Sequence, residues 1–135
     1  MSDQHDPRFH FVVVQLLGCY ALMARLFLEL PVPVELVTGL VSGEAMRDAV
    51  KHTALLAQEQ PMPKDQQFQM EHACLLWLAA DQLLGAFHGA MEADEEAEYE
   101  HLAAGAAHCI MAAEDAALEF GEWLVQQVKN ELNEE

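Results

Sequence analysis

Hydrophobic residues recur along this chain at the three-to-four-residue spacing of α-helices, and Pro or Gly residues separate the periodic stretches. The pattern predicts a first helix over residues 9–30, with Asp6 as its N-cap and Pro7 in its first turn. Three consecutive valines at residues 12–14 are the one place where a strand could compete. The two prolines within residues 31–33 end this helix.

A second helical segment covers residues 34–58, followed by a proline-rich turn at residues 60–63. The pair Ser42 and Gly43 indicates an interruption inside this segment. The hydroxyl of Ser42 can cap a new helix that begins at Glu44, because serine is a preferred N-cap residue.

The third helix is expected over residues 65–88, with Gly89 marking the turn after it. It carries two apolar stripes, so we expect it to contact partners on both sides and to lie at the centre of the fold. His72 falls within the first stripe, where a core histidine with one satisfied ring nitrogen is the simplest expectation. The first stripe contains Phe68, Leu75, Leu76, Ala79, Leu83 and Ala86, and the second contains Met70, Trp77 and Leu84.

The fourth helix is expected to begin in an acidic run and to reach Leu132. Its apolar positions alternate between spacings of three and four, which is typical of coiled coils. Gly105 and Gly121 weaken this helix but need not break it. The apolar face contains Tyr99, Leu102, Ala106, Ile110, Ala113, Ala117, Phe120, Leu124 and Val128.

These elements predict an all-α fold, a four- to five-helix antiparallel bundle with a long C-terminal helical hairpin. Residues 1–135 form a single domain, in which we expect a flexible N-terminus (1–8) and a frayed acidic C-terminus (133–135). Apolar residues make up 53% of the chain, which is high for a soluble protein. Excess apolar surface on the first or fourth helix predicts a homodimer, and whether residues 9–30 serve as core or as dimer interface stays open.

Acidic residues are concentrated toward the C-terminal end. Residues 91–135 contain thirteen Asp and Glu against Lys129 alone, which gives −12 of the net charge of −17. With six Lys and Arg in the whole chain, direct binding of nucleic acid or of an anionic membrane is disfavoured. We therefore expect the partner to be the basic surface of another protein, such as a nucleic-acid-binding or toxic protein.

The predicted contact residues lie in two acidic runs within this region. Carboxylates at a helix start also complement the helix dipole, so a merely solvated helix end is the simplest interpretation of the first run. The functional interpretation is a non-enzymatic inhibitor or adaptor that mimics nucleic acid, with no catalytic residue and no cofactor assigned. The predicted partner-binding residues are Glu92, Asp94, Glu95, Glu96, Glu98, Glu100, Glu114, Asp115, Glu119 and Glu122.

A metal-dependent hydrolase is the competing interpretation. Glu98 and His101 have the spacing with which a bundle helix offers a carboxylate and an imidazole to a metal ion. The pairs Glu95/Glu98 and Glu119/Glu122 have the form of the carboxylate pairs in magnesium-dependent all-helical nucleotide pyrophosphohydrolases, a family to which we do not assign the chain. One continuous helix would hold these pairs about 36 Å apart, so the hydrolase requires a break in it. A structural assembly subunit is a third alternative.

Three cysteines, Cys19, Cys74 and Cys109, lack the spacing of a metal site, and we expect reduced, partly buried thiols. The N-terminus carries acidic residues ahead of its first arginine, unlike a secretory signal. The uncharged stretch 9–24 would span about 24 Å as a helix, less than the roughly 30 Å of a bilayer core. We expect a cytoplasmic protein that does not span a membrane.

Overall fold

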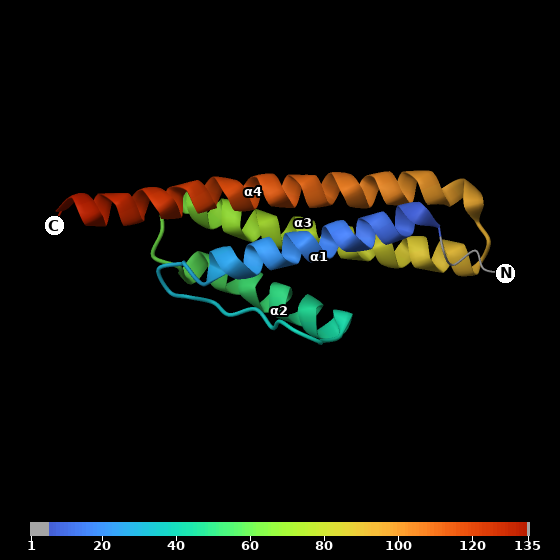
Figure 1. Ribbon diagram of the computed structural model, residues 1–135, viewed down its shortest axis with the longest axis horizontal. Helices are drawn as coiled ribbons and strands as arrows, with labels where there is room; N and C mark the ends of the chain where they lie inside the picture. Colours follow the sequence, from blue (N-terminus) through green and yellow to red (C-terminus); the bar gives the residue numbers. More distant parts are fainter. Residues whose placement is uncertain (1–5, 135) are drawn as a thin grey trace.

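The computed structural model describes residues 6–134, and within that range the chain is helical without β-strands, as the sequence predicts. The described part contains four α-helices (Figure 1). They are α1 (Pro7–Phe27), α2 (Gly43–Leu56), α3 (Lys64–Glu92) and α4 (Tyr99–Glu134), and short 3-10 helices cover Ala57–Glu59 and Glu96–Glu98.

Helix α3 lies at the centre and contacts each of the other three helices, which confirms the position expected from its two apolar stripes. It runs antiparallel to α1, α2 and α4, and it forms the long hairpin with α4 (Figure 1). Helices α1 and α2 run in the same direction because residues 28–42 carry the chain back along the bundle. We call these residues the crossing segment.

The start of α1 is set by local chemistry. The Asp6 carboxylate accepts a 2.9 Å hydrogen bond from the backbone N–H of Arg8, and Pro7 occupies the first helical position, as predicted. The Arg8 side chain also donates to this carboxylate, which lowers the pKa of Asp6. The helix ends at Phe27 rather than at residue 30, because the backbone N–H of Val34 turns back to donate to the Phe27 carbonyl oxygen at 2.9 Å.

The two ends of the chain differ in part from the expectation. Because α1 begins at Pro7, the last residues of the expected flexible N-terminus are helical, and α4 continues to Glu134. Residues 1–5 and 135 lie outside the described part. Among the described helices, α1 alone is long and apolar enough to cross a membrane by length and composition, a test that core helices of soluble proteins also pass.

The crossing segment corrects our expectation of helix over residues 34–41. It is irregular, and Gly39 adopts a φ of 90°, which favours glycine. The buried side chain of Gln60 holds the crossing segment in place. It accepts a 3.0 Å hydrogen bond from the Val32 N–H and donates a 2.7 Å hydrogen bond to the Val32 carbonyl oxygen. The Tyr20 hydroxyl donates to the carbonyl of Val37. These tertiary hydrogen bonds replace those of a helix.

Helix α2 begins where its cap predicts. The Ser42 hydroxyl accepts a 3.1 Å hydrogen bond from the backbone N–H of Ala45. Arg47 of α2 forms an ion pair with Asp81 of α3 at 2.6 Å, and this contact raises the pKa of Arg47. With 14 residues against the 29 of α3, α2 covers only part of the central helix (Figure 1).

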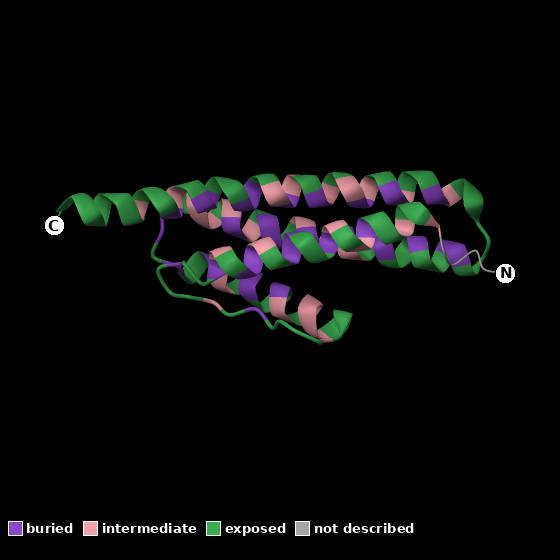
Figure 2. Ribbon diagram, viewed as in Figure 1, coloured by how far each residue is buried: buried purple, intermediate pink, exposed green. Residues whose placement is uncertain are grey.

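Burial distinguishes the two stripes of α3 (Figure 2). The second stripe forms the core, where Trp77 is fully buried. In the first stripe Leu76 and Leu83 pack against the core, but Phe68 and Leu75 are exposed, so the expectation for the first stripe holds only in part. Helical periodicity gives both stripes equal weight, and packing against the other helices, α4 above all, decides between them. The predicted face of α4 is buried at most positions up to Leu124, while Val128 is exposed where α4 extends beyond the bundle (Figure 1).

The glycines do not end the long helices. Helix α3 continues through Gly89, which corrects the predicted turn, and α4 is unbroken at Gly105 and Gly121. A Cβ atom at Gly121 would lie 3.0 Å from the Leu26 side chain, so this glycine lets α1 and α4 approach closely.

Candidate functional site

Six predicted contact residues gather at one end of the bundle, around the turn between α3 and α4. This end is the right-hand one in Figure 1. Five of their side chains are exposed and that of Glu98 is half-buried. We call this group the acidic tip; it consists of Glu92, Asp94, Glu95, Glu96, Glu98 and Glu100.

A tight helix end shapes the tip. The backbone N–H of Glu95 donates to the Ala90 carbonyl at 2.9 Å, and that of Asp94 donates to the Met91 carbonyl at 3.2 Å. This pair of hydrogen bonds is the Schellman motif, which requires a left-handed residue after the helix. Asp94 fills that position with a φ of 56°. The reversal places the carboxylates before and after it on one small surface.

Two histidines and Arg8 supply the local countercharge at the tip, and the charge of Glu100 acts on Arg8. His88 Nδ1 lies 2.9 Å from Glu92, and His101 Nε2 lies 3.1 Å from Glu98. The four side chains are each about half exposed or more, and a histidine offers a full charge only when it is protonated. Arg8 lies over the Tyr99 ring at 5.8 Å, but its guanidinium already pairs with Asp6 at 2.8 Å. Most of the tip charge therefore faces solvent.

The remaining four predicted contact residues occupy two sides of α4. Asp115, Glu119 and Glu122 line a shallow groove of about 600 Å³ between α3 and α4. Glu114 is half-buried and is not among the residues that line this groove; after burial, its charge is the second cause that raises the pKa of the Cys19 thiol of α1. About 22 Å of helix separates Glu100 from the groove, so the predicted residues do not form one continuous patch.

The groove also contains residues that the sequence interpretation missed. His72 lies in its wall and is exposed, so the expectation of a core histidine was wrong. Its ring stacks on Phe68 with centroids 5.2 Å apart, and Gln69 lies beside them. Phe68 and Gln69 each lie one turn before His72 on α3, a spacing that could have indicated a shared surface. Instead, we assigned Phe68 to the core face.

The candidate metal ligands Glu98 and His101 have no third ligand beside them among the described residues. Glu98 and His101 contact each other, but residues 6–134 contain no group of three His, Cys, Asp or Glu side chains that could hold a metal ion. Glu95 and Glu98 precede α4, which corrects the expectation of one helix through both pairs, but about 30 Å of unbroken helix still separates Tyr99 from Glu119. The break that the hydrolase interpretation requires is not found.

Two of the three thiols are poor nucleophiles in this fold. Cys19 and Cys74 are buried, and burial raises the pKa of each thiol to about 12. Cys109 is half-buried. All three are free, as expected.

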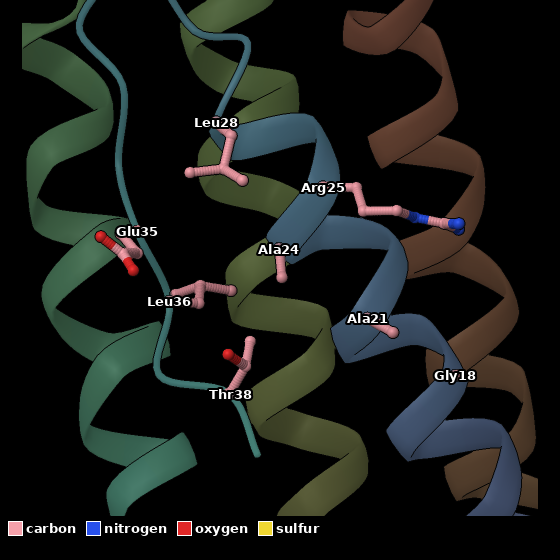
Figure 3. A pocket seen from close by; sticks show the side chains of 8 residues that line it. All are labelled: Gly18, Ala21, Ala24, Arg25, Leu28, Glu35, Leu36 and Thr38. Atoms are coloured by element: carbon pink, nitrogen blue, oxygen red, sulfur yellow. The ribbon is translucent and has the colours of Figure 1, made fainter.

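A second groove, of about 540 Å³, lies between α1 and the crossing segment (Figure 3). Gly18, Ala21 and Ala24 give it a floor of small residues, and Leu28 and Leu36 border it. It contains none of the predicted contact residues.

No protein-family model, curated protein or solved structure matches the chain. Functional inference therefore depends on its own surfaces.

Proposed function

We propose that this protein is a small, non-enzymatic interaction protein, an inhibitor or adaptor, that binds a basic site on a partner protein through the acidic tip. The supporting observation is the exposure of carboxylates around the turn between α3 and α4, where His88, His101 and Arg8 are the nearby basic groups. A basic groove that normally binds nucleic acid has the complementary charge.

The charge density at the tip favours binding by electrostatic attraction. At physiological salt, charges interact over about 8 Å, so neighbouring carboxylates at one turn act together on an approaching cationic surface. Complementary charge mainly accelerates association and suppresses wrong partners, and it adds less to affinity. On a large partner, Asp115, Glu119 and Glu122 supply a second contact about 22 Å along α4. Binding should therefore weaken strongly as salt is raised.

The test compares two variants with the same net charge. The tip variant replaces Glu92, Glu95, Glu96 and Glu98 with Gln. The control variant replaces four exposed glutamates elsewhere, and each variant has a charge of −17 + 4 = −13. The control positions are Glu29, Glu35, Glu44 and Glu59.

Proteins captured from a lysate of the native cell at low and high salt are identified by mass spectrometry, and their association rates are then measured. We expect the tip variant to lose a basic partner that the control retains, with association at least about tenfold slower. Equal retention by the two variants would show that the tip is not the contact. Absence of any partner would favour the structural assembly subunit.

The hydrolase alternative has a separate readout. Thermal unfolding is measured with magnesium, manganese and zinc ions. A stabilisation that disappears in Glu98→Ala would favour metal-dependent chemistry over the proposed function.

A further inference from the structure

Helix α1 has apolar residues on two faces, and only one of them is buried. The buried face packs against α3 and α4. On the opposite face, Phe11 is 62% exposed, Val14 54% and Leu17 45%. Gly18, Ala21 and Arg25 are exposed on the same side. We call these six residues the outer face of α1.

The outer face combines large side chains with a recess. Phe11 and Val14 project from the first half of the helix. The second half borders the groove whose floor is Gly18 and Ala21 (Figure 3). The Arg25 side chain lines this groove, is exposed and extends away from the crossing segment (Figure 3). The exposed side chains of Phe11 and Val14 thus precede Gly18, and the groove lies beside Gly18 and the residues after it.

We propose that the outer face of α1 binds a second copy of this chain, with the two α1 helices antiparallel about a two-fold axis at Gly18. Phe11 and Arg25 are each seven residues from Gly18, in opposite directions. The two-fold axis therefore sets Phe11 of each copy against Arg25 of the other, a favourable cation–π contact. Val14 similarly meets the small residue Ala21, and Gly18 lets the two backbones approach.

The distribution of charge selects this face and this direction. Helix α1 carries Arg8 and Arg25 and no acidic residue, whereas α4 carries seven acidic residues and one lysine. Among the four described helices α1 alone is net positive, so the repulsion between two chains of −17 is weakest along this helix, where Glu35 at the groove and Glu100 beside Phe11 are the bordering carboxylates. The antiparallel arrangement separates the two acidic tips by about 50 Å, several screening lengths.

The size of the outer face sets the expected strength. Six residues per copy are fewer than the roughly 20 residues of a standard interface, so we expect a dissociation constant of about 10 µM or weaker. This inference is independent of the proposed function, because it uses none of the residues of the acidic tip.

Sedimentation velocity of the full chain over about 1–500 µM measures the association. We expect a monomer–dimer equilibrium for the wild type and at least tenfold weaker association for Val14→Glu. The matched control is Leu55→Glu, on the exposed surface of α2, which should associate like the wild type. Circular dichroism checks that both variants remain helical. A monomeric wild type, or equal weakening by both variants, would overturn the proposal.

Engineered cysteines test the direction, in a Cys109→Ser background that leaves the two buried thiols. Gly18→Cys should form a disulfide with its own copy under mild oxidation. Phe11→Cys should not, but it should cross-link when mixed with Arg25→Cys. Self-linking of Phe11→Cys would contradict the antiparallel arrangement. Binding of the monomer to phosphatidylcholine vesicles, lost in Val14→Glu, would make lipid the occupant and would also overturn the proposal.

Discussion

The indole N–H of Trp77 in α3 donates a 3.0 Å hydrogen bond to the backbone carbonyl oxygen of Leu16 in α1. Both residues are buried, and the Trp77 ring also packs at 5.6 Å from that of Tyr20. This bond gives a buried polar group its partner and fixes the register of α1 along the central helix.

We predict that Trp77→Phe lowers the free energy of unfolding by about 2 kcal/mol, from the lost hydrogen bond and the smaller volume. Urea unfolding followed by circular dichroism measures the change. Trp123→Phe is the control, because Trp123 is only half-buried. An equal loss in both variants would mean that the contact with Leu16 contributes nothing specific.

Gln60 supports the crossing segment through its two hydrogen bonds to Val32. Gln60→Leu keeps most of the side-chain volume and removes both bonds, so we predict a loss of about 1–3 kcal/mol. Hydrogen exchange of the Val32 amide should accelerate. The exposed Gln58 provides the control variant Gln58→Leu, which should unfold like the wild type. Unchanged exchange in Gln60→Leu would show that other contacts hold the segment.

Alanine at two helical glycines should have opposite effects. A Cβ at the exposed Gly89 meets no atom within 4 Å, so Gly89→Ala should stabilise the protein by about 1 kcal/mol. At Gly121 the new Cβ would lie 3.0 Å from Leu26, and the displaced side chain should cancel this gain or reverse it. Thermal unfolding of the two variants shows which is the more stable, and we expect it to be Gly89→Ala. A destabilised Gly89→Ala would mean that α3 ends before this residue.

Thiol reactivity should reveal the buried cysteines. With a pKa of about 12, Cys19 and Cys74 should stay unreactive to a disulfide reagent at pH 8, while Cys109 reacts first. All three should react after denaturation. In the unfolded chain these thiols ionise near 9.0, so the unfolded state loses protons above that pH while the native state keeps them.

The two buried thiols should therefore make their full contribution to the free energy of unfolding below pH 9. Between pH 9 and pH 12 this free energy should fall by about 1.4 kcal/mol per pH unit for each thiol. Urea unfolding between pH 8 and pH 10 gives the sign. Rising stability over that range would contradict the assigned burial.

Short-range features of the fold were predictable from the sequence. Asp6 and Ser42 cap their helices through side chains two or three residues from the bonded N–H, so the pattern alone locates them. The exposed tip was equally accessible to prediction, because clustered carboxylates stay in water. The crossing segment was not, because its hydrogen bonds go to Gln60 and Tyr20 elsewhere in the chain.

The other failures concern which face of a helix meets the core. Periodicity finds both stripes of α3 but cannot rank them, so Phe68 and His72 were assigned to the interior although they line a surface groove. The groove between α1 and the crossing segment was not predicted from the sequence for a related reason. It joins Ala24 to Leu36 through a turn of the crossing segment that no local pattern specifies.

The order of the helices has a consequence for synthesis on the ribosome. The most apolar helix, α1, is translated first, and 71 residues separate its end at Phe27 from the start of α4 at Tyr99. At about 5–20 residues per second, the nascent chain carries α1 without α4, one of its two packing partners, for several seconds. A chaperone that shields emerging apolar segments would therefore raise the yield of this protein in cells.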